Sequence, residues 1–239
     1  MRLLLAALWI LVGSAITAGV YWGFLITPES TIWALMVSAL LAIVTLAMIG
    51  VTANGALVIL SQGVSPAGLR RALAAVPNVI PAALIVLLVW WLTSRAETWV
   101  ALRSGAINAW FIARFGWDDV SWLFSGVRYV AGWVRWVISA LLALSLMGGI
   151  AAVGWQAIAQ VAWLRRALRP RAVLAATLWF VALIALPWMF LVPWRPQNLP
   201  PSTIEFAFIV AKLSVSAILF ACGAALVAYE ASPAPQKLV

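Results

Sequence analysis

The chain contains no histidine, one cysteine and only six acidic residues among 239. The absence of histidine excludes His-ligated haem, His-based zinc sites and proton relays built on imidazole. The lone cysteine, Cys222, excludes an internal disulfide, so cysteine usage does not indicate a redox compartment. No phosphate-binding loop, dinucleotide fingerprint or serine-base arrangement is present either. We therefore expect no metal and no cofactor.

Charge of any sign is scarce. Charged residues make up 9% of the chain and hydrophobic residues 66%, and the mean hydropathy is +1.10. A soluble domain carries about 25% charged residues, which it needs to cover a surface facing water. This composition predicts that the membrane is the main solvent of the chain. The net charge of +9 then indicates contact with lipid headgroups and a fixed topology, not nucleic-acid binding.

Six apolar stretches are long enough to form helices that cross about 30 Å of hydrocarbon. We expect these spans at about 3–26, 32–60, 76–93, 130–161, 172–192 and 204–229. The first stretch is longer than the apolar core of a signal peptide, which favours an uncleaved first span. The predicted fold class is thus an all-α polytopic integral membrane protein. Residues 1–230 form one transmembrane domain, and 231–239 are expected to be a short mobile tail.

The segment 94–128 differs from its surroundings, because it mixes aromatic residues with several charges. Tryptophan and tyrosine favour the headgroup level, where an apolar ring and a polar edge are both satisfied. Ile107, Phe111 and Phe115 recur every four residues and would share one helical face. We predict amphipathic helices on the membrane surface between the third and fourth spans, broken near Gly116.

The basic residues predict an orientation with both termini in the cytoplasm. With that orientation, eight Lys and Arg residues lie inside and six lie outside. The inner set includes two clusters that we expect to meet lipid headgroups and that consist of Arg70, Arg71, Arg165, Arg166, Arg169 and Arg171. The abundance of arginine and alanine fits a bacterium with GC-rich codons. The predicted location is therefore a bacterial inner membrane.

One five-residue sequence occurs in both of these clusters. The letters LRRAL occur at 69–73 and again at 164–168, 95 positions apart. Each copy follows a long apolar span and precedes a span that contains proline. Because two crossings separate them, both copies lie on the same side of the membrane. The repeated sequence suggests a parallel repeat of a helix pair, as found in transporters. In a chain rich in Leu, Ala and Arg, however, an identity of five residues also arises by chance.

Lys212 lies about eight residues into the sixth span, and it is the one charged residue between 206 and 229. A lysine within a spanning helix either lines a polar cavity or extends its long side chain to the headgroups. Glu205 shares its helical face but lies two turns away. Asn78 lies between Pro77 and Pro81, where a helix break would free backbone carbonyls. A permease with a cavity near Lys212, Asn78 and Glu205 is one alternative function; ordinary hydrogen bonding between helices is the other interpretation of Asn78.

Asp118 and Asp119 form the only acidic pair. Carboxylates of this kind hold Mg²⁺ or exchange protons, so a membrane-embedded transferase acting on a lipid phosphate is a second alternative, with Arg114 nearby. Adjacent residues on a helix diverge, however, so a helix cap with salt bridges to Arg114 or Arg103 is the favoured interpretation of the pair.

Taken together, the residues favour a non-catalytic membrane protein that serves as an accessory or assembly subunit. Its expected partners are membrane lipids and either other membrane subunits or further copies of the chain. The balance of the sequence is against an enzyme, without deciding the point.

Overall fold

The computed structural model describes residues 1–27, 30–117, 120–191 and 203–232. All regular secondary structure in these ranges is helical. Six helices are long and apolar enough to cross a membrane, spanning Arg2–Ile26, Ile32–Gln62, Val76–Leu102, Ser121–Val153, Pro170–Phe190 and Ile204–Ala231. This confirms the predicted all-α polytopic fold.

The spanning helices and their connections follow a simple order. The long elements are α1 (Arg2–Ile26), α2 (Ile32–Gln62), α4 (Val79–Leu102), α6 (Ser121–Trp133), α7 (Ser139–Val153), α9 (Pro170–Phe180), α10 (Leu186–Leu191) and α11 (Thr203–Ala231). The π-helical turns η2 (Val134–Ile138) and η4 (Val181–Ala185) join α6 to α7 and α9 to α10 without a break. The connecting elements are α3 (Pro66–Ala74), η1 (Val76–Asn78), α5 (Ser104–Phe115), η3 (Trp155–Ile158) and α8 (Ala162–Ala167).

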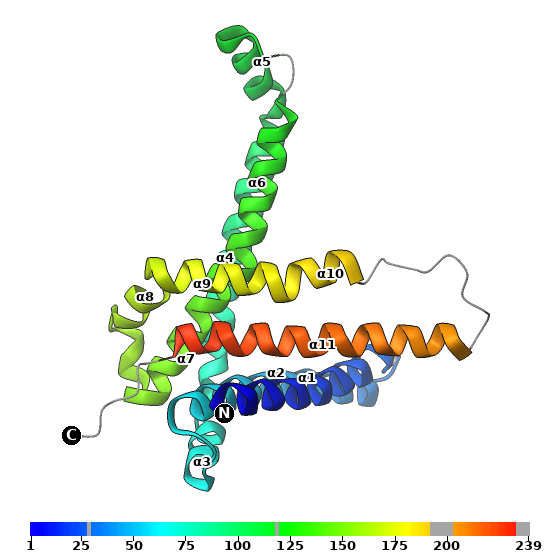
Figure 1. The fold of residues 1–239 in the computed structure, drawn as a ribbon, viewed down its shortest axis with the longest axis vertical. Helices are drawn as coiled ribbons and strands as arrows, with labels where there is room; N and C mark the ends of the chain where they lie inside the picture. The colour runs from blue at the N-terminus through cyan, green and yellow to red at the C-terminus, as the bar shows by residue number, and fades with distance from the viewer. Residues whose placement is uncertain (28–29, 118–119, 192–202, 233–239) are drawn as a thin grey trace.

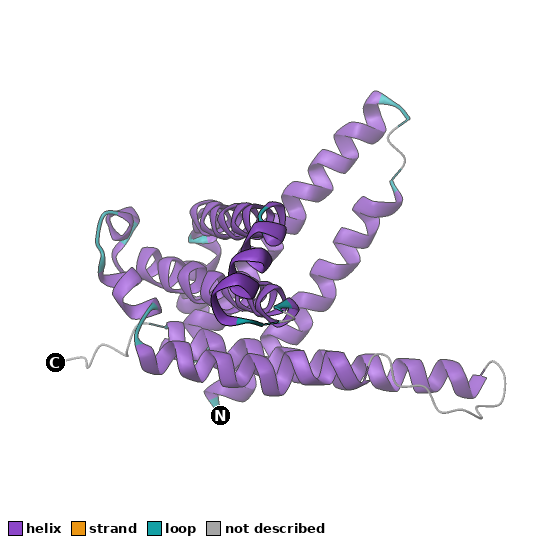
Figure 2. Ribbon diagram, turned by 90° about the horizontal axis from the view of Figure 1, so that it is seen from above, coloured by secondary structure: helices purple, strands orange, loops and turns teal. Residues whose placement is uncertain are grey.

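The helices form three hairpins that meet at one end and fan apart at the other. The hairpins are α1 with α2, α4 with α6–α7, and α9–α10 with α11. Figure 1 shows α4 and α6 rising away from the level of α1, α2, α9, α10 and α11. In the view from above, the hairpin of α1 and α2 also diverges from α11 (Figure 2). We call the meeting point the hub.

The hub is built from small residues. Its largest cluster of buried side chains consists of Ala6, Ala7, Ile10, Ala56, Leu57, Ile59, Leu60, Ala82, Ala143, Met147, Ala221, Ala225 and Ala228. These come from the inner ends of α1, α2, α4, α7 and α11. Between membrane helices there is no hydrophobic driving force, because lipid tails are as apolar as leucine, and close packing of small residues replaces it. The alanines therefore explain why the helices join here.

Two glycines on opposite helices allow α1 and α2 to approach closely. A Cβ at Gly55 would stand 2.3 Å from Nε1 of Trp9, and a Cβ at Gly13 would stand 2.4 Å from Oγ1 of Thr52. Trp9 Nε1 donates a hydrogen bond to the backbone oxygen of Thr52 at 3.1 Å, which holds the indole against α2. Neither glycine can be enlarged without moving a neighbour.

The helix ends around the charged segment differ from those expected. The third spanning helix continues to Leu102, and the fourth begins at Ser121, so only α5 within 94–128 is a helix of its own. Arg95 and Glu97 do not interrupt the helix, because arginine and glutamate both favour the helical backbone. Arg95 lies 5.6 Å from the centroid of the Trp91 ring, and Glu97 pairs with Arg135.

Two further boundaries are set by local geometry. The fourth spanning helix ends at Val153, eight residues before the expected 161, because Gly154 takes a φ of 77° and ends the helix. α5 ends at Gly116, where the predicted break lies, with a left-handed φ of 68°. At the carboxyl end, Ala231 is a fully buried residue of α11 and not part of a free tail. The rest of the predicted tail, 233–239, lies outside the described residues.

The two copies of LRRAL adopt the same local plan. In each case a glycine with positive φ ends a long helix, Gly63 after α2 and Gly154 after α7. The motif then forms a short connecting helix, α3 or α8, which leads into a helix that contains proline near its start. The alanine at the fourth motif position is buried in both copies, at 1% exposure for Ala72 and 0% for Ala167. The shared geometry favours the repeat hypothesis.

Candidate functional site

A pair of asparagines forms the polar centre of the hub. Asn54 Nδ2 donates to Asn78 Oδ1 at 3.0 Å, and Asn78 Nδ2 donates back to Asn54 Oδ1 at 2.9 Å. Asn78 Nδ2 also donates to the backbone oxygen of Met147 at 3.2 Å. Both side chains are 1% exposed. The pair thus ties α2, the start of α4 and α7 together, as the interpretation of Asn78 as an interhelical hydrogen-bonding residue predicts.

The two prolines place Asn78 at this point. Pro77 belongs to the 3-10 turn η1, and Pro81 lies in the first turn of α4. Backbone N–H groups in a first helical turn have no acceptor within the helix, so a proline there removes nothing. The prolines therefore begin α4 instead of kinking it, and the turn before it directs Asn78 into the hub.

The amide groups of this pair are not accessible to a ligand. The reciprocal amide pair leaves each oxygen with a donor, and both residues lie among alanines, leucines and methionine. A buried polar group that is satisfied in this way rigidifies its surroundings, whereas a solute site needs donors or acceptors that a ligand can reach. The geometry is that of a structural hydrogen-bonded contact that locks the helices together, and not that of a solute site.

The sixth span carries Lys212 and Glu205 away from Asn78. Lys212 is partly buried, and its Nζ lies 5.4 Å from the centroid of the Phe208 ring one turn earlier on α11. Glu205 lies in the first turn of α11 and is exposed. The partners of Asn78 lie on α2 and α7, so the contacts of these three residues do not form one polar cavity.

The acidic pair Asp118 and Asp119 lies outside the described residues. Arg114, in the last turn of α5, is exposed. Within the ranges that the structure describes, no group of three His, Cys, Asp or Glu side chains is placed to hold a metal ion.

Sequence reasoning missed an ion pair between the third and fourth spans. Arg135, in the π-helical turn η2, pairs with Glu97 of α4 and donates to Thr93 Oγ1 at 2.8 Å and Ser94 Oγ at 3.1 Å. Its guanidinium also lies 5.7 Å from the centroid of the Trp90 ring. The available signal was two opposite charges within long apolar helices, which need a partner. π-helical turns are often found where a helix accommodates such a contact.

The predicted headgroup arginines lie in two connections beside the hub. We call α3, with Arg70 and Arg71, the first corner, and the stretch from α8 to the start of α9, which carries the other four, the second corner. Arg70, Arg71, Arg165, Arg169 and Arg171 are exposed, and Arg166 is partly buried. Burial, and secondly the charge of Arg169, lower the pKa of Arg166 below its ordinary value. Among the described residues, Arg166 Nη1 and Trp163 Nε1 have no hydrogen-bond partner although both atoms are buried. The second corner therefore contains buried side-chain nitrogens whose hydrogen-bonding capacity is not used within the described residues.

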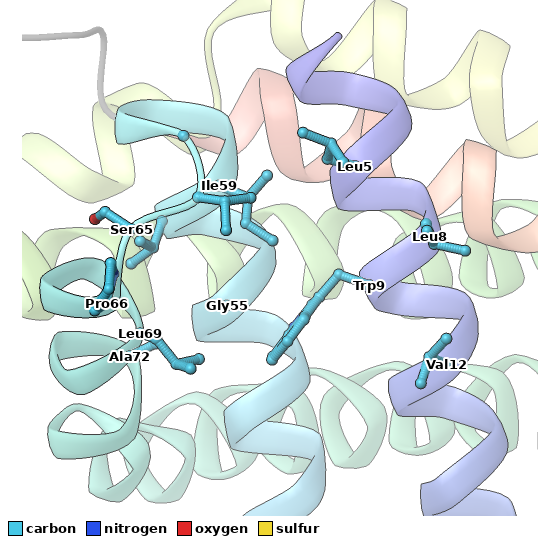
Figure 3. A pocket seen from close by; sticks show the side chains of 13 residues that line it. Leu5, Leu8, Trp9, Val12, Gly55, Ile59, Ser65, Pro66, Leu69 and Ala72 are labelled. Carbon is cyan, nitrogen blue, oxygen red and sulfur yellow. The ribbon is translucent and has the colours of Figure 1, made fainter.

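An apolar pocket of about 540 Å³ opens beside the first corner. Its walls come from the first half of α1, the end of α2, and α3 with the turn before it. They are lined by Leu5, Leu8, Trp9, Val12, Gly55, Val58, Ile59, Gly63, Val64, Ser65, Pro66, Leu69 and Ala72. Figure 3 shows Trp9 reaching from α1 towards α2 near Gly55, with Pro66 and Leu69 on the side of α3. The pocket includes none of Lys212, Asn78 and Glu205.

Comparison with known proteins adds no assignment. No protein-family model, no curated protein and no solved structure matches the chain. The function therefore has to follow from the geometry alone.

Proposed function

We propose that this chain is a non-catalytic accessory or assembly subunit of a bacterial inner membrane, and that its hairpins pack against helices of a partner membrane protein. One observation carries the proposal. In five of the six spanning helices, at most 17% of the most apolar window is buried within the chain. Only the fourth, at 50%, packs extensively against its own chain.

The fanned arrangement favours assembly over transport. A transporter holds its substrate near the bilayer midplane between packed helices. Here the packed part is the hub, at one end of the helices, and its polar centre is closed by the pair of Asn54 and Asn78. The outer halves diverge (Figure 1) and present large apolar side chains, such as Leu40 at 59% exposure and Leu87 at 64%. Such faces supply close-packing surfaces for added helices.

The exposed aromatic residues support a protein partner in addition to lipid. Trp22, Trp33, Trp91, Trp99, Trp136 and Trp188 are all more than half exposed and lie along the three hairpins. Tryptophan is enriched in protein interfaces, where one residue supplies a large contact area. It is also enriched at the headgroup level, so the experiment separates the two roles.

The orientation follows the distribution of arginine. The corners formed by α3 and α8 carry the clusters around Arg70 and Arg165, and both lie beside the hub. With the hub on the cytoplasmic side, both termini are cytoplasmic and the fanned ends point outward, in agreement with the excess of basic residues in cytoplasmic connections.

Site-specific photocrosslinking in intact cells tests the assembly role. A photoreactive amino acid replaces Leu40 on α2 or Leu87 on α4, and Leu57, which is 4% exposed within the hub, serves as the matched control. We expect both outer positions to give an adduct with the same second membrane protein, and the control to give none. That protein should also co-purify at a fixed ratio in mild detergent. Adducts with lipid only, together with a monomeric mass in native-lipid discs, would contradict the proposal; adducts of the chain with itself would replace it by a homo-oligomer.

A further inference from the structure

The pocket beside the first corner combines an apolar interior with a basic rim. The interior contains Leu5, Trp9 and Ile59, and the pocket volume of about 540 Å³ falls within the range of about 300–1,000 Å³ that is usual for small-molecule sites. Because Trp9 Nε1 already donates to the oxygen of Thr52, the indole presents only its apolar ring to the pocket. An occupant of the interior therefore has to be a hydrocarbon.

Two guanidinium groups lie beside the pocket, those of Arg2 and Arg71. Arg2 Nε lies 3.8 Å from the place that a Cβ would take at Gly63, which lines the pocket, and Arg2 Nη1 donates to the oxygen of Ser61 at 3.1 Å. On α3, Arg71 is hydrogen-bonded to the side chain of Gln62, which directly precedes the pocket residue Gly63.

These cations have no acidic counterpart in the described part of the chain. Arg71 Nη1 donates to the neutral Gln62 Oε1 at 3.1 Å, and the one ion pair found there joins Arg135 to Glu97 instead. The rim thus offers positive charge to an anion from outside the chain. A guanidinium binds a phosphate through two parallel hydrogen bonds, which gives both strength and orientation.

We propose that this pocket is a binding site for an anionic glycerophospholipid, which inserts one acyl chain between α1, α2 and α3 and places its phosphate at Arg2 and Arg71. The pocket opens to the bilayer, since Leu8 is 57% and Val64 72% exposed. An acyl chain gains little by leaving other lipid tails for an apolar pocket, because both surroundings are hydrocarbon. Selectivity therefore rests on the phosphate and the headgroup charge, and it favours the negatively charged cytoplasmic leaflet.

A photoactivatable lipid tests the site on the full-length protein. Phosphatidylglycerol with a diazirine in mid-chain is compared with phosphatidylcholine that carries the same chain, in mixed micelles. The labelled positions are mapped by mass spectrometry. We expect phosphatidylglycerol to label 5–12 and 55–59 several-fold more strongly than phosphatidylcholine does.

Three variants probe the two halves of the site, and two more serve as controls. Arg2→Gln should lower the labelling about fivefold, the effect of one arginine near a charged surface. Arg2→Lys keeps the charge that orients the first helix and should lower it less. Val64→Trp should fill the mouth and lower it for both lipids. Arg165→Gln, with the same charge change at the other corner, serves as one control.

A matched bulky variant, Leu40→Trp, on an exposed face away from the pocket, is the second control, and neither control should change the labelling of these segments. Equal labelling by the two lipids, labelling spread evenly over all exposed helices, or labelling unchanged in Val64→Trp would overturn the proposal. The site does not depend on the assembly role. A monomer that shows the selective labelling would contradict that role and support the lipid site.

Discussion

Asn54 and Asn78 exchange two hydrogen bonds, of 3.0 and 2.9 Å, across the centre of the hub. They lie 24 residues apart in the chain, on α2 and on the turn before α4. Because each amide satisfies the other, the centre of the hub carries a specific polar lock inside a cluster made largely of alanine. A packing of small apolar side chains alone would not fix the register of three helices so closely.

Breaking this lock on one side should destabilise the protein. Asn78→Leu leaves the Asn54 amide buried without a partner, which costs about 1–3 kcal/mol of unfolding free energy. The double variant Asn54→Leu, Asn78→Leu removes both polar groups and should lose less than the sum of the two single losses. Denaturation in detergent, followed by circular dichroism, measures the cycle. Strict additivity would show that the two amides do not interact.

A methyl group added at Gly55 should disrupt the contact of α1 with α2. Its Cβ would lie 2.3 Å from Trp9 Nε1, and relieving such a clash costs about 1–3 kcal/mol. Gly19→Ala is the matched control, because nothing lies within 4 Å of its Cβ position. Alanine favours helix by about 1 kcal/mol over glycine, so the control should be neutral or stabilising. Equal thermal stability of the two variants in detergent would argue against so close a contact between Trp9 and Gly55.

Removing the guanidinium of Arg135 should loosen the second hairpin. Arg135→Met leaves Glu97 without its partner, and we expect a loss of about 1–3 kcal/mol, nearer the lower figure because the two side chains are 18% and 27% exposed. Arg128→Met makes the same charge change at an exposed site on the same helix and should cost little. Proteolysis within 94–128 should accelerate only in Arg135→Met. Similar behaviour of both variants would show that the pair contributes nothing specific.

Cysteine labelling checks the orientation. In a Cys222→Ser background, Ala67→Cys reports on the corner beside α3 and Gly105→Cys on the start of α5; both positions are exposed. If the excess of basic residues is cytoplasmic, a membrane-impermeant maleimide added to intact cells should react at 105 and not at 67. After lysis both should react. Labelling at 67 in intact cells would reverse the proposed topology.

The sequence predicts the spans better than their ends. Long apolar stretches specify crossing helices because each residue contributes its own transfer free energy, whatever its neighbours in space. Around 94–128 hydropathy marks where the apolar stretches end and not where the helices end, because charged residues also favour helix. Nor does it show which residues meet, since the partner of Glu97 lies 38 residues away. A charge pattern along the chain does not contain that information.

In the candidate site, too, the sequence predicts single residues but not the contacts between them. The place of Asn78 between two prolines predicts a helix break that could serve a solute, whereas an asparagine near the end of a span predicts hydrogen bonding between helices. The structure shows the second, and the sequence does not identify the partner, Asn54. That the arginines of the first corner bind headgroups stays a prediction. The pocket beside them could not be predicted, because its walls come from three helices whose apolar residues look alike in sequence. Asp118 and Asp119 stay untested predictions.

By itself, the sequence determined that this protein consists of six membrane-crossing helices, since length and hydropathy act locally. It also determined which connections are basic, and the break near Gly116, where a glycine ends α5. Only the tertiary structure decided that the helices join at one end, that Asn54 meets Asn78, and that Trp9, Leu69 and Arg2 surround one pocket. These contacts bring together residues that are distant along the chain, and they depend on how closely small side chains let the helices approach.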